Sequence, residues 1–134
     1  MQWNGGPNSG FTTGAPWLPL DEDYKIRNVD AEQQDPTSML SLYHRLIALR
    51  MVEPALSVGS YSPFASNDDL IAYVRQYEHR RLLVVLNLSS LPHTLEGLLN
   101  EGRVLFSTNL DREGEELTRS VALRPDEGVI IELF

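Results

Sequence analysis

The chain contains no cysteine, so a disulfide framework and a thiolate metal site are both excluded. This absence fits a cytoplasmic protein, which is the location we expect. No run of about 18 apolar residues occurs, so the sequence predicts no membrane-spanning helix. The first residues also lack the basic and apolar regions of a signal peptide, and we expect none.

Positive charge is scarce, with 11 Lys and Arg residues against 19 Asp and Glu and a formal net charge of -8. We therefore expect no nucleic-acid partner and no binding to an anionic membrane, because both need a basic surface. Hydrophobic residues make up 42% of the 134 residues, which is enough for a core. These values predict one globular domain of ordinary size, with room for a short appendage.

The first 34 residues show no apolar period. They begin MQWNGGPNSGFTTGAPWLPL, and these twenty residues include four glycines and three prolines, which helices and strands disfavour. Disordered segments have few aromatic residues, yet this stretch carries Trp3, Phe11 and Trp17. We therefore predict that residues 1–34 form a loop that a larger body normally holds in place.

Residues 35–51 carry the clearest helical pattern. Asp35 is a plausible N-cap, Pro36 suits the first turn, and Pro54 prevents continuation beyond the end. Apolar residues recur at a spacing of three or four positions: Met39, Leu42, Tyr43, Leu46 and Ile47. The pattern predicts one amphipathic helix over these residues.

After the helix the pattern changes to short strands with turn signals between them. The expected strands are 56–61, 70–77, 81–88, 93–99, 103–109, 119–125 and 128–134. A series of this kind is typical of an antiparallel β-sandwich. The run 81–88 is apolar on both faces, so we expect Leu83 and Val85, Val84 and Leu86, or both pairs, to lie in the core.

Residue types that carry out catalysis or bind metals are present but not in a recognisable pattern. His44, His79 and His93 lack the spacing of metal ligands. The serines have no GxSxG context, and the glycines of the first segment do not follow a strand and open a helix, as a phosphate loop would. We therefore predict no metal ion and no cofactor.

Two carboxylate pairs, Asp68–Asp69 and Glu115–Glu116, are the candidates for glycosidase groups. Adjacent residues in a strand point to opposite faces, so neither pair can flank one bond from a strand, and we interpret both as turn residues. The aromatic side chains of the first segment, Trp3, Phe11 and Trp17, could stack on sugar rings. The composition of the segment favours instead their packing against a neighbouring surface. The residues alone therefore indicate no catalytic site.

The order of several motifs is more informative. MQWN, GFTTGAPWLPL, YKIRNVDAEQQDPTSMLSLYHRLIALR, LSVGSY and LRPDEGVIIELF follow one another along the chain. Together they resemble the C-terminal end of the α-glucosidases of glycoside hydrolase family 13, in the α-amylase superfamily. The resemblance is greatest to the oligo-1,6-glucosidase, dextran glucosidase and trehalulose- or trehalose-forming subgroup. It covers the whole chain and is strongest over residues 1–61.

The resemblance implies a fold and a division of the chain. Residues 1–54 would be the end of a catalytic (β/α)8 barrel, namely the loop after the last strand and the last helix. Residues 55–134 would be a mostly β, antiparallel β-sandwich C-terminal domain. The family's aspartate nucleophile, glutamate acid/base and second aspartate lie on earlier barrel strands, so the resemblance implies no catalytic residue in this chain. Its role would be structural, with the barrel as its partner in cis.

The resemblance also implies where an α-glucoside would bind. In an intact parent enzyme, a retaining hydrolase or transglycosylase, Gln2, Trp3 and Asn4 would lie near the substrate. The family commonly has aspartate where this chain has Asn4. That departure leaves the subgroup open, and isomaltose, maltose, sucrose and trehalose all remain candidate substrates.

Two other interpretations stay open at this point. A carbohydrate-binding β-sandwich module would need exposed, coplanar aromatic side chains, for which the candidates are Tyr61, Phe64, Tyr73 and Tyr77. A stand-alone interaction domain would leave the opening loop unexplained. Under the family interpretation, the surfaces that the barrel would cover are exposed in this chain, and we expect a homodimer induced by truncation.

Overall fold

The structure is a computed structural model, and it describes residues 1–66, 69–98 and 101–134. Asp68 and the end of the strand expected at 93–99 lie partly or wholly outside these residues. The chain forms two compact units, Met1–Arg45 and Leu46–Phe134, which we call unit 1 and unit 2. None of the helices in the described part is long and apolar enough to cross a membrane.

Unit 1 contains two short helical segments, η1 (Pro7–Gly10) and α1 (Val29–Gln34). The prediction that residues 1–34 are loop throughout is therefore wrong. Asn28 starts α1, because its Oδ1 accepts a hydrogen bond from the Ala31 N–H at 2.9 Å. A single side-chain cap satisfies an N–H that helix formation leaves unpaired. Six residues are too few for an apolar period to reveal such a helix.

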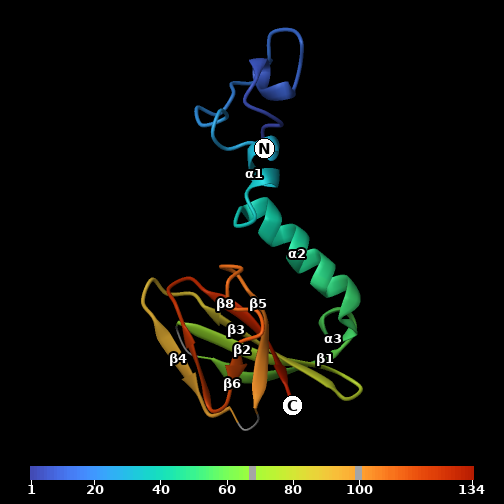
Figure 1. Ribbon diagram of the computed structural model, residues 1–134, viewed down its shortest axis with the longest axis vertical. Coiled ribbons are helices and arrows are strands. Elements are labelled where there is room, and N and C mark those ends of the chain that lie inside the picture. The colour runs from blue at the N-terminus through green and yellow to red at the C-terminus, as the bar shows by residue number, and fades with distance from the viewer. Residues whose placement is uncertain (67–68, 99–100) are drawn as a thin grey trace. The chain divides into compact units, whose positions relative to one another are not determined.

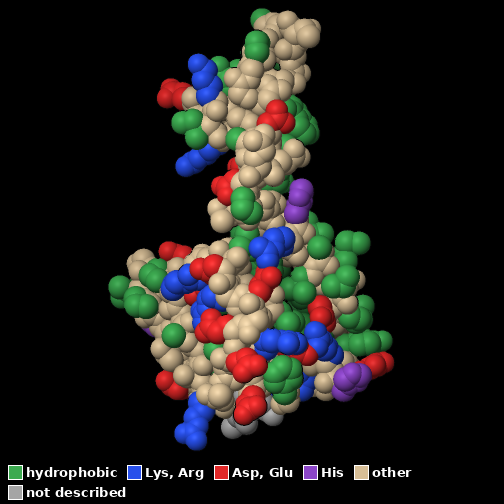
Figure 2. Space-filling model, in the orientation of Figure 1, with side chains coloured by type: hydrophobic (Ala, Val, Ile, Leu, Met, Phe, Trp, Pro, Cys, Tyr) green, Lys and Arg blue, Asp and Glu red, His purple; other side chains and the backbone are tan. Residues whose placement is uncertain are grey.

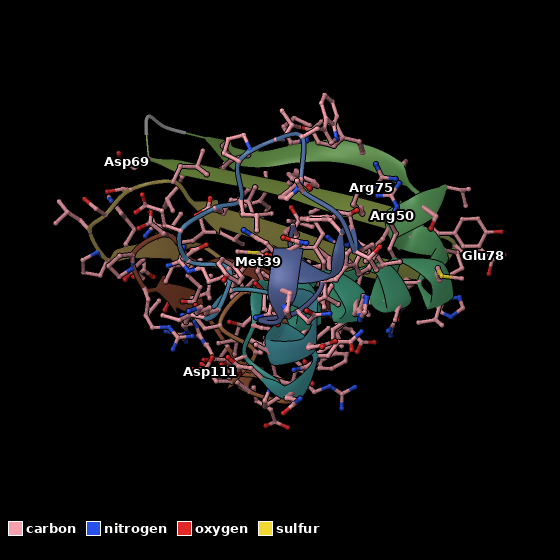
Figure 3. All side chains as sticks on the ribbon, turned by 90° about the horizontal axis from the view of Figure 1, so that it is seen from above. Met39, Arg50, Asp69, Arg75, Glu78 and Asp111 are labelled. Atoms are coloured by element: carbon pink, nitrogen blue, oxygen red, sulfur yellow. The ribbon has the colours of Figure 1, made fainter. Side chains whose placement is uncertain are left out.

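The long helix α2 (Met39–Val52) begins four residues later than the sequence predicts. Asp35 is not its N-cap: its carboxylate accepts from the Thr37 N–H and hydroxyl at 2.8 and 2.7 Å. A residue before proline avoids the helical region, so Asp35 stays extended. Ser38 caps the helix instead, since its Oγ accepts a backbone N–H three residues on at 3.1 Å. Figure 3 labels Met39 near one end of α2 and Arg50 near the other.

The strand expected at 56–61 is also misplaced. Pro54–Ser57 forms a helical turn, α3, and the first strand, β1, is Ser60–Ser66. Proline at the first helical position favours the turn. Gly59 then lets the chain pass close to it, because a Cβ at this position would lie 2.4 Å from the carbonyl oxygen of Ala55.

Unit 2 is mainly antiparallel sheet (Figure 1). A six-stranded sheet has the order β1-β2-β3-β8-β5-β6, and β4 pairs with β7 in a separate two-stranded sheet. The remaining strands are β2 (Leu70–Tyr77), β3 (Arg80–Asn87), β4 (His93–Glu96), β5 (Gly102–Ser107), β6 (Glu116–Leu117), β7 (Ser120–Leu123) and β8 (Gly128–Leu133). The expected mainly antiparallel β fold is confirmed. The two-residue β6 is too short for a sequence pattern to predict.

The core of unit 2 contains side chains from both sheets. Leu83 and Val85 of β3 are fully buried, and they belong to one cluster with Leu95 of β4 and Val121 of β7. The opposite face of β3 is apolar as well, with Val84 6% exposed. The core prediction is confirmed for Leu83, Val85 and Val84, whereas Leu86 is only partly buried. On the surface, charged side chains of both signs intermingle on the visible face of unit 2 (Figure 2).

Candidate functional site

The opening segment of unit 1 is held by backbone hydrogen bonds. The carbonyl oxygens of Gln2 and Trp3 accept from the N–H groups of Val29 and Asp30, at 2.9 and 3.1 Å. These donors lie in the first turn of α1, where N–H groups lack partners inside the helix. The Trp3 N–H donates to the Ser9 carbonyl at 3.0 Å. The segment therefore has a defined place between α1 and the turn at residues 8–10.

The predicted substrate residues Gln2, Trp3 and Asn4 do not surround one cavity. Gln2 lines a hollow of about 700 Å³ together with Phe11 and Trp17. Asn4 lines a different hollow, formed with residues of the η1 turn. Trp3 is 55% exposed, and Trp17 is 91% exposed. Gln2 and Asn4 thus line two neighbouring hollows that share Phe11 and Thr12, and Trp3 lines neither of the two.

Asn4 takes part in the shape of its own loop. Its Oδ1 accepts from the Gly6 N–H at 3.0 Å. A Cβ at Gly10 would lie 2.7 Å from the Asn4 Nδ2, so the glycine lets the amide pack closely. Asn8 and Ser9 both have a φ of 53°, and Gly10 has a φ of 76°, which gives three successive left-handed residues. An aspartate could accept the same hydrogen bond, so asparagine keeps the turn and removes a negative charge.

The histidines do not form a metal site within the described residues. His44 and His79 are exposed, and His93 Nε2 lies 3.5 Å from Asp69 Oδ2. Among the residues that the structure describes, no group of three or more His, Asp or Glu side chains could hold a metal ion.

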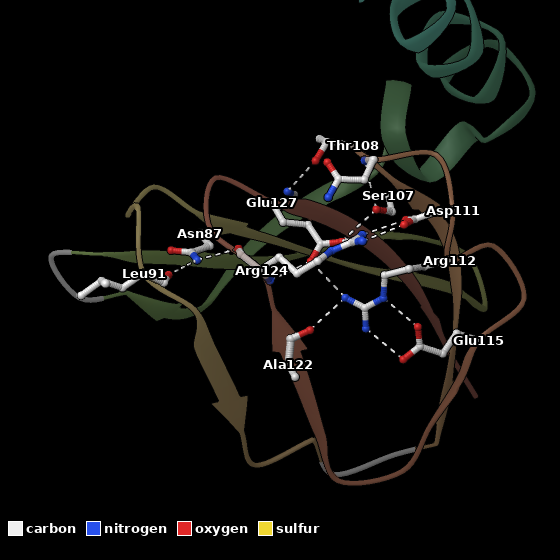
Figure 4. Close-up of polar contacts among 12 residues, drawn as sticks. Asn87, Leu91, Ser107, Thr108, Asp111, Arg112, Glu115, Ala122, Arg124 and Glu127 are labelled. Carbon is white, nitrogen blue, oxygen red and sulfur yellow. Dashed lines mark hydrogen bonds and ion pairs between the residues drawn. The ribbon is translucent and has the colours of Figure 1, made fainter. Parts of the chain in front are cut away.

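The most connected polar group lies in unit 2 around Glu127 (Figure 4). We call it the Glu127 cluster, and its members are Ser107, Asp111, Arg112, Glu115, Arg124 and Glu127. Glu127 is buried, with 1% of the whole residue exposed. It accepts from Arg124 Nη2 at 2.6 Å, from Arg112 Nη1 at 3.1 Å and from Ser107 Oγ at 2.9 Å. The Arg124 backbone N–H adds a fourth hydrogen bond at 2.8 Å.

Two further carboxylates complete the cluster. Asp111 binds Arg124 through two hydrogen bonds of 2.6 and 2.7 Å, and Glu115 binds Arg112 through two of 2.7 and 2.9 Å. The hydrogen bonds from the guanidinium groups lower the pKa of Asp111 and of Glu115. Each carboxylate is ionised and already paired, so the cluster joins loops and offers no unpaired acid or base. Its members come from separate segments, which is why the sequence does not reveal it.

Comparisons with known proteins identify the family. The family description "Alpha amylase, catalytic domain" matches residues 1–59. The probable oligo-1,6-glucosidase 3 of Bacillus subtilis (strain 168) is 35% identical over 133 residues, which are 97% of this chain and 24% of the relative. The chain belongs to the alpha-amylase family. The resemblance inferred from the motif order is thereby confirmed.

Other members of the alpha-amylase family are similar over much of the chain. The trehalose-6-phosphate hydrolase of Escherichia coli (strain K12) is 41% identical over 90 residues, which are 66% of this chain and 16% of the relative. The crystal structure of the trehalulose synthase MutB from Pseudomonas mesoacidophila MX-45 matches with a TM-score of 0.88 at 33% identity. That match covers 99% of this chain and 24% of MutB. The chain thus spans about a quarter of the length of the first of these relatives and of MutB.

Proposed function

We propose that the chain is the C-terminal part of an alpha-amylase-family enzyme that acts on α-glucosidic bonds. One observation carries the proposal: the chain matches glucosidases along nearly its whole length while covering 24% of theirs, and its first 59 residues match a catalytic domain. The reaction would proceed with retention through a covalent glycosyl-enzyme. The acid/base and nucleophile would lie in the remaining part of the enzyme.

The division of the chain follows from the same proposal. Residues 1–54 would close a (β/α)8 barrel, with α2 as its last helix, and residues 55–134 would form a C-terminal β-sandwich. The shared core of the six-stranded and two-stranded sheets supports a sandwich. The exposure of apolar side chains along α2 supports a covering partner in cis. The second domain would stabilise the barrel and perform no chemistry.

The opening segment would border the substrate. Gln2 offers an amide that can donate and accept hydrogen bonds to sugar hydroxyls, and Trp3 offers an exposed ring face. Asn4 would act through the shape of the loop, since its Oδ1 already binds the Gly6 N–H. Neither a metal ion nor a cofactor takes part in this proposal.

The test is the activity of the longer gene product. We expect the purified enzyme to hydrolyse or isomerise at least one of isomaltose, maltose, sucrose and trehalose. Gln2→Ala should lower kcat/KM by about tenfold or more. Gln33→Ala, the same change at an exposed position of α1, serves as the control and should leave kcat/KM unchanged. A reading frame without the three upstream carboxylates, or an inert product, would contradict the proposal.

The alternative function is that of a carbohydrate-binding β-sandwich module. Tyr61 is 59% exposed, but its ring and that of Tyr73 are inclined by 37° with centroids 5.2 Å apart. Tilted rings make a poor platform for a flat sugar face. We expect calorimetric titration of the chain with maltooligosaccharides to show no binding tighter than about 0.1 mM. If binding were tighter than this and Tyr61→Ala removed it, the carbohydrate-binding module would be favoured.

A further inference from the structure

The loop at residues 8–14 of unit 1 is closed by one side chain, that of Asn8. Its Nδ2 donates hydrogen bonds to the carbonyl oxygen of Thr12 at 3.1 Å and to that of Gly14 at 2.7 Å. An asparagine amide has two N–H donors, so these two bonds use both of them. The Asn8 side chain therefore joins carbonyl groups that lie four and six positions further along the chain.

Asparagine also suits the backbone at this position. Asn8 has a φ of 53°, a left-handed conformation that asparagine adopts more readily than most other residues with a side chain. Ser9 follows with the same φ, and a left-handed serine persists only where the surrounding contacts hold it. The Phe11 N–H donates to the Asn8 carbonyl at 3.0 Å and adds a backbone contact to the same turn. The side chain and the backbone of Asn8 thus both hold the loop.

The loop is bonded to the opening segment. The Ser9 carbonyl oxygen accepts from the N–H groups of Trp3 and Asn4, at 3.0 and 3.4 Å. Gly10 lies against the same two residues, because a Cβ at Gly10 would lie 2.7 Å from the Asn4 Nδ2 and 3.0 Å from the Trp3 Cβ. A shift of the loop would therefore also shift the backbone of the segment that contains the predicted substrate residues.

The loop also forms a wall that the two hollows share. Phe11 and Thr12 line both the hollow beside Gln2 and the hollow beside Asn4. In the sequence they lie between Asn8 and the second carbonyl that it binds, so the Asn8 amide fixes the part of the chain that carries them. Loss of this amide should change both hollows at once.

We propose that Asn8 is a positioning residue for the binding of an α-glucoside. By closing the loop, it holds Phe11 and Thr12 as the shared wall of the two hollows. This role rests on the proposed function, which supplies the α-glucoside. Asn8 acts through the carbonyl groups of the loop, and the reacting carboxylates would lie elsewhere in the enzyme. The loop should therefore contribute to binding in the ground state and the transition state alike, which sets KM and leaves kcat unchanged.

Two variants of the longer enzyme test the role. Asn8→Asp keeps the size of the side chain and its tolerance of positive φ, but places carboxylate oxygens where the two N–H donors were. Asn8→Gly also accepts positive φ and removes the donors without adding a charge. We expect each variant to raise KM about tenfold for the substrate on which the wild type is most active, and to leave kcat within about twofold. Asn109→Asp, the same change at an exposed position of unit 2, is the control and should alter neither constant.

The split between KM and kcat separates positioning from a merely structural role. Partial unfolding would lower the amount of active enzyme, so kcat would fall while KM stayed the same, and this result would overturn the proposal. A rise in KM confined to Asn8→Asp would identify the added charge as the cause and would also overturn it. A wild-type enzyme that is inert towards every substrate would instead contradict the proposed function, and hydrogen exchange would then decide the role of Asn8 in the loop.

Hydrogen exchange in the 134-residue chain, followed by NMR, tests the loop without a substrate. The Trp3 N–H should exchange about tenfold faster in both Asn8 variants than in the wild type, because its acceptor, the Ser9 carbonyl, belongs to the loop. The N–H groups of β3 report on unit 2 and should exchange at the wild-type rate. A wild-type Trp3 N–H without protection, no change in the variants, or an equal acceleration in β3 would each contradict the role of Asn8.

Discussion

Removal of the Glu127 carboxylate should destabilise unit 2 more than any change to an exposed charge of the same cluster. The side chain of Glu127 is 0% exposed and lies between Arg112 and Arg124. These contacts join the end of β5, the loop that contains Arg112 and the turn between β7 and β8. Glu127→Ala would leave two guanidinium groups without their shared carboxylate and Ser107 without its acceptor.

The magnitude follows from burial. Breaking a buried ion pair by removal of one partner costs about 3 to 5 kcal/mol, and we expect this loss in the free energy of unfolding for Glu127→Ala. Glu127→Gln keeps the shape and one acceptor oxygen, so we expect about 2 kcal/mol, the value of hydrogen bonds to a charged group. Asp111→Asn is the matched control. Asp111 and Arg124 are 48% and 44% exposed, and such a pair contributes at most about 1 kcal/mol.

Urea unfolding of the three variants, followed by circular dichroism, measures these differences. Similar losses for Glu127→Gln and Asp111→Asn, or a loss below about 1 kcal/mol for Glu127→Ala, would refute the reasoning, because burial would then not set the cost.

Acid titration gives a second readout of the same carboxylate. Burial has the largest single effect and raises the pKa of Glu127, but hydrogen bonds from Arg124 and Ser107 and the charge of Arg112 outweigh it and lower the pKa below 4.5. A carboxylate with a lowered folded-state pKa stabilises the fold fully above its unfolded pKa and loses this effect as the pH falls through the folded value. The difference between wild type and Glu127→Gln should therefore be constant above about pH 5.5 and shrink below 4.5.

Three further outcomes are expected. Leu83→Ala should lower the free energy of unfolding by about 2 to 5 kcal/mol in urea, because Leu83 is fully buried, and a loss below about 0.5 would contradict the core assignment. Glu78→Gly should raise stability by about 0.5 to 1 kcal/mol in thermal melts, because Glu78 has a φ of 52° in the β2–β3 turn; a lower melting temperature would argue against strain there. The chain should not hydrolyse p-nitrophenyl α-glucoside above a buffer control, because the proposed catalytic carboxylates lie elsewhere; clear turnover would contradict this.

Local patterns explain what the sequence predicts well. The strand at 70–77 is found with its predicted bounds, and the apolar run 81–88 is displaced by one residue. Each of the two segments is a run of eight residues with a strand-like pattern, and a turn separates them. The short helices α1 and α3 escape prediction because single residues, Asn28 and Pro54, set their starts. Many residues in a sequence are of a type that can cap a helix. A single such residue therefore does not predict a short helix before the structure is known.

The candidate site also depends on contacts that the sequence does not reveal, here between residues that lie farther apart along the chain. The motif order was enough to single out Gln2, Trp3 and Asn4. It could not show that Gln2 and Asn4 line two different, adjoining hollows, because the hollow beside Asn4 is formed by the left-handed turn at residues 8–10. The Glu127 cluster is hidden for a related reason. Its members are spread from Ser107 to Glu127, and only the pairing of β5 with β8 brings both ends together.

The two parts of the chain differ in what stabilises them, and this difference bears on function. Unit 2 buries apolar side chains of both sheets in one core, and the Glu127 cluster ties its loops. In contrast, α2 carries an apolar stripe that the described chain leaves exposed. Five large apolar side chains on one helix oppose solubility, although Leu46 lines a hollow with Val84 and Ile130 of the six-stranded sheet. Such a stripe is useful only where a second surface meets it. Under the proposed function, that second surface would be the rest of the catalytic domain.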